Sequence, residues 1–454
     1  MKQISLESVA LATGGKLVNG NPEALINGVT MDSRKVVKGN LFAAIKGERV
    51  DGHDFIDDVF TKGAAAVICE KLPEDPNGAC ILVNNTVKAL QDLAEYYRKS
   101  LNIRVVGITG SVGKTSTKEI VAATLSAKYK VLKTEGNYNN EIGLPLTVLS
   151  IGEEHEIAVL EMGISDFGEM RVLSKIARPD ICVITNIGQS HLENLGSRDG
   201  IYKAKSEIFE YMNPKGFIFL NGDDDILCTK KDVNGIRPAT FGLTPDCDVH
   251  PADIVPHGLK GTSLKVVTRE ETFPVNVKLF GKHMISNIMA AVSVGKSLSM
   301  TTAEIMKGLE NASTIDGRLK LIPFGEGFII DDCYNAAPSS MRAAIDTLSM
   351  AEGVKAAVLG DMFELGTDSD LMHREIGEYA AKTGIDKLIC IGENSIHMYE
   401  GAKSVASGVK LKYFPTVAKF IEEIPLLFEK DDTILVKASH GMEFVKVVEA
   451  LKNR

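Results

Sequence analysis

The stretch GITGSVGKTSTKE, residues 107–119, combines closely spaced glycines with a lysine and hydroxyl side chains, a composition typical of phosphate-binding loops. Such glycines let backbone N–H groups approach phosphate oxygens, the lysine reaches the terminal phosphates, and a following threonine can ligate Mg²⁺. The usual pattern G-x-x-x-x-G-K-[ST] has a glycine where this chain has Ile108. A strand pattern before the loop and a helical pattern after it favour phosphate binding over a glycine-rich turn with an incidental lysine. The candidate residues are Gly110, Ser111, Gly113, Lys114, Thr115 and Ser116.

Acidic and imidazole side chains follow the next two apolar runs. EIAVLEMG contains Glu161 at its end, and ICVITN leads into IGQSHLE, which contains His191. If both runs are parallel strands beside the loop, their carboxyl ends meet at one edge of the sheet, where ligands gather. We therefore expect Glu161 to hold the metal of a bound nucleotide, and its alternatives are a helix cap or a solvated loop acid. For His191, the alternative to a role in the site is that of a hydrogen-bonded loop residue.

A lysine on an apolar helix face is the third chemical feature. In DGIYKAKSEIFEYM a helical period places Ile201, Ala204 and Ile208 on one stripe that continues to the final methionine, and Lys205 lies on it whereas Lys203 does not. Burial lowers the pKa of an ammonium group and leaves a nucleophilic amine. Such a lysine can pair with an acid, touch phosphate, or react with CO₂ to give a carbamate able to ligate a second Mg²⁺. From spacing alone, a lysine whose ammonium reaches solvent remains the alternative.

The pattern of apolar runs predicts an α/β protein that positions these residues. Short apolar runs and the amphipathic segment ALQDLAEYYRKS indicate a first domain over residues 1–98. From IRVVGITG onward, apolar runs alternate with helical patterns such as KTSTKEIVAATLSAKY, which predicts a parallel sheet flanked by helices over residues 99–315. The alternation restarts after NASTIDGRLK and predicts a second doubly wound domain over residues 316–454.

Composition excludes several other classes of protein. The 454 residues suit about three domains, and a net charge of −9 provides no overall positive field for nucleic acid or anionic lipid. Seven scattered cysteines without a C-x-x-C pair argue against a disulfide framework or a zinc ribbon. The sequence has neither a signal-peptide core nor an apolar run of about 18 residues. We therefore expect a cytoplasmic protein with no nucleic-acid partner and no membrane insertion. A monomer is also expected, although composition does not fix the oligomeric state.

Motifs along nearly the whole chain resemble the Mur ligases of peptidoglycan synthesis. They run from DSRKVVKGNLFAAIKGERVDGHDF to ILVKASHGM, with GITGSVGKTST, EGNYNNEIGLPLT, LEMGISDFGEM, TNIGQSHLENLGS, KAKSEIF, GKHMISNIMAA, DGRLKLI, DDCYNAAPSSMRAA and VLGDMFELG between them. This family carries T-G-S-x-G-K-[ST] at the loop and therefore requires no glycine at Ile108. The resemblance implies a small α/β N-terminal substrate domain, a central ATP-binding domain of P-loop type with a mostly parallel sheet, and a Rossmann-like C-terminal domain.

The resemblance also implies a reaction. In the family, ATP phosphorylates the terminal carboxylate of a UDP-muramoyl peptide, and an amine then attacks the acyl phosphate and releases phosphate. The motifs YNAAPSSM and GDMFELG favour the branch that adds D-Ala-D-Ala to UDP-MurNAc-tripeptide. The alternatives are a sibling ligase that adds a single amino acid and, more distantly, a P-loop ATPase of another class. The identity of the third peptide residue, lysine or diaminopimelate, stays open.

Residue roles follow from the resemblance position by position. Lys114 would serve the triphosphate, Thr115 and Glu161 would hold one Mg²⁺, and His191 with carbamylated Lys205 would hold a second. The other nucleotide matches are Asn287 near adenine, Arg318 reaching phosphate across the hinge, and Asp332 in the C-terminal domain. The substrate matches are Ser33 and Arg34 for the uridine nucleotide, Asn139 and Asn140 along the muramoyl peptide, and Tyr334 and Asn335 beside Asp332.

Some positions carry weaker expectations. Apart from the resemblance, the DSR sequence at residues 32–34 would be interpreted as an ordinary turn. Glu364 and His373 are expected to support the dipeptide site, or else to stabilise a loop or a helix. Three residues depart from the family pattern, namely Met284, Ala337 and His440, and they bear on adenine contact and dipeptide binding.

Overall fold

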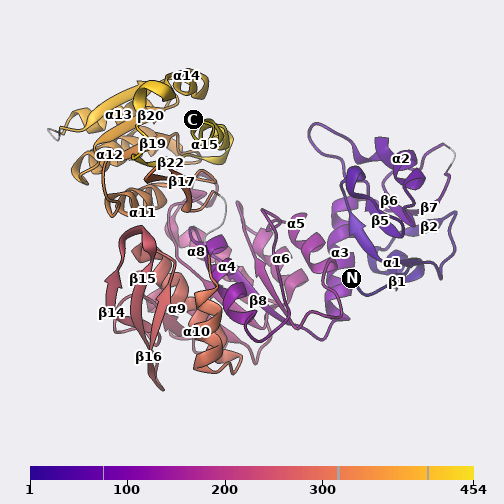
Figure 1. Ribbon diagram of the computed structural model, residues 1–454. Helices are drawn as coiled ribbons and strands as arrows, with labels where there is room; N and C mark the ends of the chain where they lie inside the picture. Colours follow the sequence, from indigo (N-terminus) through magenta and orange to yellow (C-terminus); the bar gives the residue numbers. More distant parts are fainter. Residues whose placement is uncertain (75, 314–316, 406–407) are drawn as a thin grey trace.

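The computed structural model describes residues 1–74, 76–313, 317–405 and 408–454, which form three successive α/β lobes. Figure 1 shows an open arrangement with the N-terminal lobe at one end, the C-terminal lobe at the other and the central lobe between them. This three-domain α/β architecture confirms the predicted fold class. The predicted boundary between residues 315 and 316 lies outside the described residues, and the domain limits stay a proposal.

The N-terminal lobe is built on a five-stranded sheet of order β2-β7-β6-β5-β4. Strands β4 to β7 run parallel to their neighbours, and β2 is an antiparallel edge strand. Its elements are β1 (Ile4–Ser5), α1 (Leu6–Thr13), β2 (Lys16–Val18), β3 (Leu25–Ile26), β4 (Gly28–Thr30), β5 (Asn40–Ala43), α2 (Ile56–Thr61), β6 (Ala66–Cys69), β7 (Ala79–Leu82) and α3 (Thr86–Lys99). The predicted helix ALQDLAEYYRKS falls in α3, which leads into the central lobe (Figure 1).

The central lobe has a parallel six-stranded sheet of order β13-β12-β11-β8-β10-β9. Strand β8 therefore lies between β10 and β11, so that the three segments with candidate chemistry are neighbours. The elements are β8 (Arg104–Thr109), α4 (Lys114–Leu125), β9 (Val131–Lys133), α5 (Gly143–Leu149), β10 (Ile157–Glu161), α6 (Glu169–Ala177), β11 (Ile181–Ile184), α7 (Leu192–Leu195), α8 (Arg198–Ser206), β12 (Phe217–Asn221), β13 (Ala239–Phe241), α9 (Lys282–Ser297) and α10 (Thr302–Glu310).

A three-stranded antiparallel sheet, which sequence analysis did not predict, extends the central lobe. It consists of β14 (His250–Pro256), β15 (Thr262–Val267) and β16 (Thr272–Val277) in that order. Alternate residues of β16 are buried, which is the pattern of a strand with one face on the core. A second difference concerns α8: the α-helix ends at Ser206 and continues as a 3₁₀ turn over Glu207–Phe209, rather than as one helix through Met212.

The C-terminal lobe repeats the doubly wound plan, as predicted. Its sheet has the order β17-β18-β22-β19-β20-β21, in which β17 is antiparallel and all other pairs are parallel. The elements are β17 (Lys320–Phe324), β18 (Gly327–Asp331), α11 (Pro338–Ser349), β19 (Lys355–Gly360), α12 (Ser369–Lys382), β20 (Lys387–Ile391), α13 (Ser395–Lys403), β21 (Lys410–Phe414), α14 (Val417–Leu427), β22 (Thr433–Lys437) and α15 (Val445–Lys452).

The N-terminal and central lobes share one hydrophobic core, whereas the C-terminal lobe is built mainly on separate ones. One apolar cluster runs from Leu6 and Leu41 in the N-terminal lobe through α3 to Leu160 and Ile184 in the central lobe. At that junction the buried hydroxyl of Tyr97 accepts a hydrogen bond from the Lys2 N–H and donates one to the Ile151 carbonyl, both at 2.6 Å. The C-terminal lobe instead has two clusters on the two faces of its sheet, and one of them includes Phe280 of the central lobe. None of the described helices combines the length and the apolar composition that a bilayer crossing requires.

Candidate functional site

The glycine-rich loop joins the carboxyl end of β8 to the amino end of α4, as the sequence predicts. Gly113 precedes the first turn of α4 with a φ of 85°, a conformation that favours glycine. A Cβ atom on Gly110 would lie 1.9 Å from Thr185 Oγ1, so the loop needs glycine there for close approach to β11. Ile108 is fully buried in β8 and pairs with Glu161 of β10. Strand geometry therefore continues through the position at which the usual motif has its first glycine.

Side chains from the segment after β11 hold this loop in place. The amide of Asn186 accepts from the Val112 N–H and donates to the Val112 carbonyl, both at 2.9 Å, and Ser111 Oγ accepts from the Gly188 N–H at 2.9 Å. Lys114 folds over the loop, with its Nζ 2.9 Å from the Gly110 carbonyl. Burial lowers the pKa of Lys114, and the nearby carboxylate of Glu161 opposes this shift. The loop is thus an ordered cradle with backbone N–H groups and one ammonium group.

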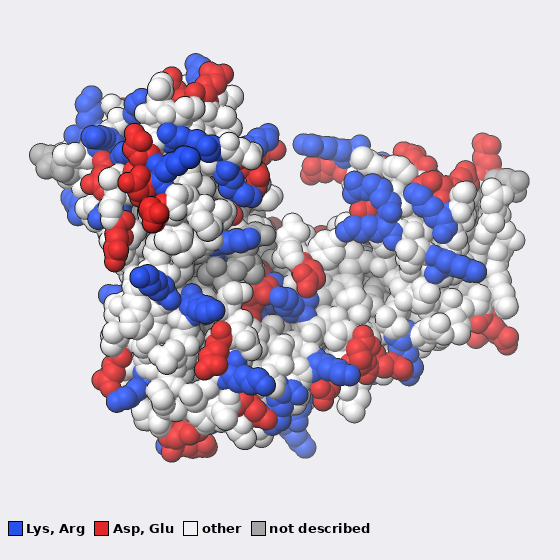
Figure 2. Space-filling model, viewed as in Figure 1, with Lys and Arg blue, Asp and Glu red and all other residues white. Residues whose placement is uncertain are grey.

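The cradle opens into a pocket of about 400 Å³ between the central and C-terminal lobes. Figure 2 shows the molecule broadly hollowed between its N-terminal and C-terminal lobes, above the central lobe. Of the predicted residues, the pocket is lined by Ser111, Gly113, Lys114, Thr115, Ser116, Asn287, Arg318, Asp332 and Asn335. Glu161, His191 and Lys205 are not among its lining residues.

The carboxylate of Glu161 lies beside the loop at the end of β10. Its Oε1 accepts hydrogen bonds from Thr115 Oγ1 at 3.1 Å and from Asn139 Nδ2 at 2.8 Å. Its Oε2 is buried and has no hydrogen-bond partner, and the same is true of Thr109 Oγ1 on the neighbouring strand. These are the two such side-chain atoms found within the described ranges. A buried acceptor without a donor is costly, so the geometry suits a cation at this edge of the sheet.

His191 and Glu364 join the central lobe to the C-terminal lobe. His191 Nδ1 lies 3.0 Å from Glu364 Oε2, and the neighbouring imidazole lowers the pKa of this carboxyl. Both residues have positive φ values, 60° and 61°, which non-glycine residues adopt rarely. The predicted loop position of His191 after β11 is confirmed, and its ring contact is with an acid of the facing lobe.

Lys205 is buried on α8, as the apolar stripe predicts, with 1% of its surface exposed, whereas Lys203 is exposed. No hydrogen bond or ion pair joins its Nζ to another residue in the described ranges. Burial, and secondarily the positive charge of Lys114, lower the pKa of Lys205 well below its usual value. Burial and the nearby Lys114 ammonium therefore both disfavour the charged form of Lys205.

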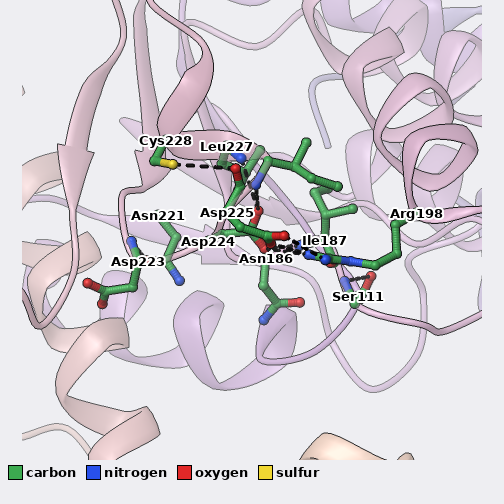
Figure 3. A network of polar contacts seen from close by, with 12 residues as sticks. Ser111, Asn186, Ile187, Arg198, Asn221, Asp223, Asp224, Asp225, Leu227 and Cys228 are labelled. Atoms are coloured by element: carbon green, nitrogen blue, oxygen red, sulfur yellow. Dashed lines mark hydrogen bonds and ion pairs between the residues drawn. The ribbon is translucent and has the colours of Figure 1, made fainter.

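A polar network fixes the loop that leads to His191 (Figure 3). Asp224 Oδ2 accepts from the Ile187 N–H at 2.7 Å, and Arg198 Nε donates to the Ile187 carbonyl at 2.9 Å. Arg198 also forms an ion pair with Asp225. Asn221 Nδ2 donates to the Thr185 carbonyl at 2.8 Å. Because Arg198 begins α8, this network ties the helix of Lys205 to the segment that braces the phosphate loop.

The C-terminal lobe contributes charged groups to the opposite wall of the pocket. Asp332 Oδ2 accepts from Lys437 Nζ at 2.6 Å, and the same ammonium donates to the Asn335 carbonyl at 2.9 Å. The Arg318 guanidinium lies over the Tyr334 ring, 4.3 Å from its centre. Burial lowers the pKa of His283, which faces these charges from α9. The predicted residues of this wall therefore lie together, although their ligands stay predictions.

Of the three departures from the family pattern, Met284 and Ala337 line the pocket, whereas His440 contacts Tyr334. Met284 contacts Asn287, whose Nδ2 lies 3.7 Å from the sulfur atom, and Asn287 Oδ1 accepts from Thr117 Oγ1 at 3.0 Å. The His440 ring lies 5.5 Å from the ring of Tyr334. Ala337 lines the pocket at the start of α11. None of the three side chains hydrogen-bonds to the phosphate loop.

The predicted substrate residues are distributed over two regions. Asn139 contacts Glu161, whereas Asn140 Oδ1 accepts from the Gly143 N–H at 2.8 Å and thus supports the start of α5. In the N-terminal lobe, Ser33 begins a 3₁₀ turn, and Arg34 forms a bidentate ion pair with Asp32 while its side chain is 86% exposed. Their roles toward a substrate stay predictions.

His373 supports the loop that carries Glu364. Its Nε2 accepts from the Met362 N–H at 2.9 Å, which requires the neutral ring, and its Nδ1 donates to the Ser369 carbonyl at 2.7 Å. Burial lowers the pKa of His373, in agreement with this neutral tautomer. The expectation that His373 stabilises a loop is therefore the one that its contacts favour.

Sequence reasoning missed two buried lysines. Lys437 ends strand β22 at the ligand-bearing edge of its sheet, so the rule that selected Glu161 would also have selected it. Lys118 lies one turn after Lys114 on α4 and is fully buried. Its Nζ contacts the adjacent Glu119 and the carbonyl of Thr134, and no sequence pattern identifies the second contact, because Thr134 follows strand β9.

Three family models match successive segments of the chain. They are the Mur ligase family, catalytic domain, at residues 25–109, the Mur ligase middle domain at 108–295, and the Mur ligase, glutamate ligase domain, at 317–440. The UDP-N-acetylmuramoyl-tripeptide–D-alanyl-D-alanine ligase of Bacillus subtilis (strain 168) is 39% identical over 98% of both chains.

Solved structures agree with these matches. A crystal structure of MurF from Acinetobacter baumannii has a TM-score of 0.92 at 32% identity and covers 100% of both chains. The MurF ligase of Thermotoga maritima in complex with ADP has a TM-score of 0.83 at 31% identity, covering 94% of this chain and 97% of that one. The chain therefore belongs to the Mur ligase family of ATP-dependent ligases that form C–N bonds.

Proposed function

We propose that this ligase joins D-Ala-D-Ala to UDP-MurNAc-tripeptide with cleavage of ATP, giving UDP-MurNAc-pentapeptide, ADP and phosphate. The observation that carries the proposal is a phosphate loop that opens into a pocket lined by both the central and C-terminal lobes. Similarity over 98% of the chain to ligases of that name from Bacillus subtilis and Escherichia coli (strain K12) supports the choice of substrates. The ADP complex of the Thermotoga maritima relative supports ATP as the nucleotide.

The reaction has two bond-forming steps. A carboxylate oxygen of the tripeptide bonds to the γ-phosphorus of ATP while the bond from that phosphorus to the ADP oxygen breaks. The D-Ala-D-Ala nitrogen then bonds to the acyl carbon, phosphate leaves with the electron pair of the C–O bond, and the amine proton passes to solvent. Both steps bring anions together, so this chain's contribution is positioning and positive charge. Lys114 supplies charge from the loop, and Arg318 supplies it from the facing lobe.

The residues near the loop fit a divalent cation. Glu161 presents a buried oxygen without a partner, and the Thr115 hydroxyl lies 3.1 Å from the other carboxylate oxygen. No group of three or more His, Cys, Asp or Glu side chains suited to a metal ion occurs in the described ranges, so phosphate oxygens would complete the coordination. Mg²⁺ held by Thr115 and Glu161 would supply positive charge beside the triphosphate.

A second Mg²⁺ site would use His191 and a carbamate on Lys205. The uncharged form of the Lys205 amine would bond to the carbon of CO₂ and release one proton, which gives a buried anion with two oxygens. Incubation with ¹³C-labelled bicarbonate should give a carbamate carbon signal that is lost in Lys205→Met and kept in Lys203→Met, whose side chain is exposed. A wild-type protein without this signal contradicts the carbamate.

The lobes would divide the remaining work. Residues 1–98 would bind the uridine nucleotide through Ser33 and Arg34, residues 99–315 would bind ATP, and residues 316–454 would bind the dipeptide near Tyr334 and Asn335. Asn139 and Asn140 would follow the muramoyl peptide. We propose a cytoplasmic protein, since its substrates are small soluble molecules. We also propose a monomer, and sedimentation analysis would measure the oligomeric state.

The acceptor amine is the measurement that decides the function. The protein is incubated with ATP, Mg²⁺, UDP-MurNAc-tripeptide containing either lysine or diaminopimelate, and an equimolar mixture of D-Ala-D-Ala and single amino acids. Mass spectrometry should show a product heavier by one D-Ala-D-Ala, together with ADP, and Lys114→Met should form neither. Addition of one amino acid would instead identify a sibling ligase, and ADP release without a peptide product would identify an ATPase of another class.

A further inference from the structure

Lys118 is a buried lysine whose contacts lead to the candidate metal ligand. It lies four residues after Lys114 on α4 and is 1% exposed. Its Nζ donates to the Thr134 carbonyl at 2.6 Å and lies 2.9 Å from Glu119 Oε1. A buried ammonium group is costly unless it is paired and hydrogen-bonded, so this arrangement indicates a specific use.

Thr134 follows strand β9 and uses each of its polar groups. Its N–H donates to the Val159 carbonyl at 3.0 Å, its carbonyl accepts from Lys118, and its Oγ1 accepts from the Glu161 N–H at 2.9 Å. The residue is fully buried, so water does not replace these bonds. Thr134 therefore connects the helix of the phosphate loop to the end of β10.

This connection acts on the backbone of Glu161, whose side chain has an unpaired buried oxygen. Thr115, the second candidate ligand, is on the same helix as Lys118 and donates a hydrogen bond to the Glu161 carboxylate. Helix α4 is thus connected to the end of β10 twice, directly through Thr115 and indirectly through Lys118 and Thr134. We propose that Thr134 and Lys118 are positioning residues that direct the Glu161 carboxylate toward the divalent cation bound with the nucleotide. This inference rests on the Mg²⁺ site of the proposed function.

A purely structural brace is the competing explanation, and the chain offers a matched control for it. The Lys133 side chain also pairs with Glu119, but it is half-exposed, and its ammonium does not hydrogen-bond to the adjacent Thr134. Lys133→Met removes a partner of Glu119 without touching the connection to Glu161. Thr134→Ser keeps the hydroxyl that Glu161 N–H needs, whereas Thr134→Val has nearly the same shape and lacks it.

The test measures binding of a fluorescent ADP analogue at increasing Mg²⁺ and in EDTA, for the full chain and its variants. Thr134→Val should raise the Mg²⁺ concentration for half-maximal binding about tenfold, as removal of partners behind metal ligands typically does. Lys118→Met should shift it in the same direction. Thr134→Ser and Lys133→Met should remain within about twofold of wild type, and affinity in EDTA should be equal for all proteins.

Thermal melting without nucleotide separates positioning from general stability. If Thr134→Val has the Mg²⁺ dependence of Thr134→Ser, the positioning role is wrong, whatever its stability. If wild type itself binds ADP equally with Mg²⁺ and with EDTA, the proposed metal site fails, and the inference fails with it. If Lys118→Met does not fold, the pair of Thr134 variants still decides the question.

Discussion

Replacing Glu161 with glutamine distinguishes the effect of its carboxylate on the stability of the ligand-free protein from its effect on Mg²⁺-dependent nucleotide binding. In the ligand-free protein, Oε1 accepts hydrogen bonds from Thr115 and Asn139, and a glutamine carbonyl can keep both. The second oxygen is buried without a donor, which costs about 1–3 kcal/mol. Because the variant removes the charge at this oxygen, it relieves part of that cost.

Two losses oppose this gain. A neutral acceptor weakens each of the two hydrogen bonds by roughly 1 kcal/mol, since bonds to charged groups are about twice as strong. Lys114 also loses a nearby negative charge, although its bond to the Gly110 carbonyl at 2.9 Å remains. The gain and the losses are similar in size, so we expect the ligand-free stability of Glu161→Gln to stay within about 2 kcal/mol of wild type.

Nucleotide binding with Mg²⁺ should respond much more strongly. Changes behind a metal ligand cost about 10- to 100-fold in affinity, so the loss of the ligand itself should cost on the order of 100-fold, or about 2.7 kcal/mol. In EDTA the variant and wild type should bind ADP alike. The prediction is therefore a specific loss of Mg²⁺ dependence in a protein of nearly unchanged stability.

The assay benefits from the absence of tryptophan in the chain, because the fluorescence of a labelled ADP then has little protein background. Titrations with Mg²⁺ and with EDTA give the affinities, and urea melts without nucleotide give the stability. Glu141→Gln is the matched control, because the substitution removes the same charge and Glu141 is exposed, two residues after Asn139. It should behave as wild type in both measurements.

Either of two results would refute this reasoning. If ADP affinity of Glu161→Gln rises with Mg²⁺ as in wild type, the carboxylate is not a metal ligand. If the ligand-free variant loses more than about 3 kcal/mol, the carboxylate is a structural group whose unpaired oxygen carries no functional meaning.

Three further predictions concern other parts of the molecule. Tyr97→Phe leaves the buried Ile151 carbonyl without its donor and should cost about 1–3 kcal/mol in urea melts, with unchanged ADP affinity. Gly110→Ala places a Cβ 1.9 Å from Thr185 Oγ1 and should weaken ADP binding about 10- to 100-fold in the same fluorescence titration. Burial lowers the pKa of His373, so below about pH 6.5 the unfolded chain binds a proton before the folded protein does, and stability falls with pH. Melting temperatures of His373→Gln should fall less steeply than those of wild type across this window, and equal slopes would contradict the assignment.

Much of the fold was predictable because the strands of the parallel sheets are short apolar runs between helical patterns. The rule that parallel strands end at one edge also predicted that Glu161 lies beside the phosphate loop, and the structure places it against Thr115. Helical spacing placed Lys205 on the apolar stripe but left open whether its ammonium reaches solvent, and the structure buries the side chain, even though α8 ends earlier than predicted.

Contacts between distant segments were not predictable in this way. The antiparallel sheet of β14–β16 depends on pairing between short strands, for which alternation of apolar residues gives little signal. One partner of Lys118 is a carbonyl just after strand β9, and the partner of His191 is an acid on another lobe. Such contacts depend on how elements pack, which residue spacing along the chain does not encode.

In the described part of the chain, two fully buried oxygens without hydrogen-bond partners lie at one edge of the central sheet, whereas buried charged groups elsewhere are paired. Buried charges away from the loop edge have partners: Lys437 pairs with Asp332, and Lys118 pairs with Glu119. Thr109 Oγ1 and Glu161 Oε2, the fully buried side-chain oxygens without a partner in the described ranges, lie on adjacent strands at the ends that flank the phosphate loop. Folding energy alone favours satisfying such atoms or replacing them with apolar ones. Their retention at one edge of one sheet therefore indicates that ligand atoms complete the site, and the Mg²⁺ dependence of ADP binding tests that conclusion directly.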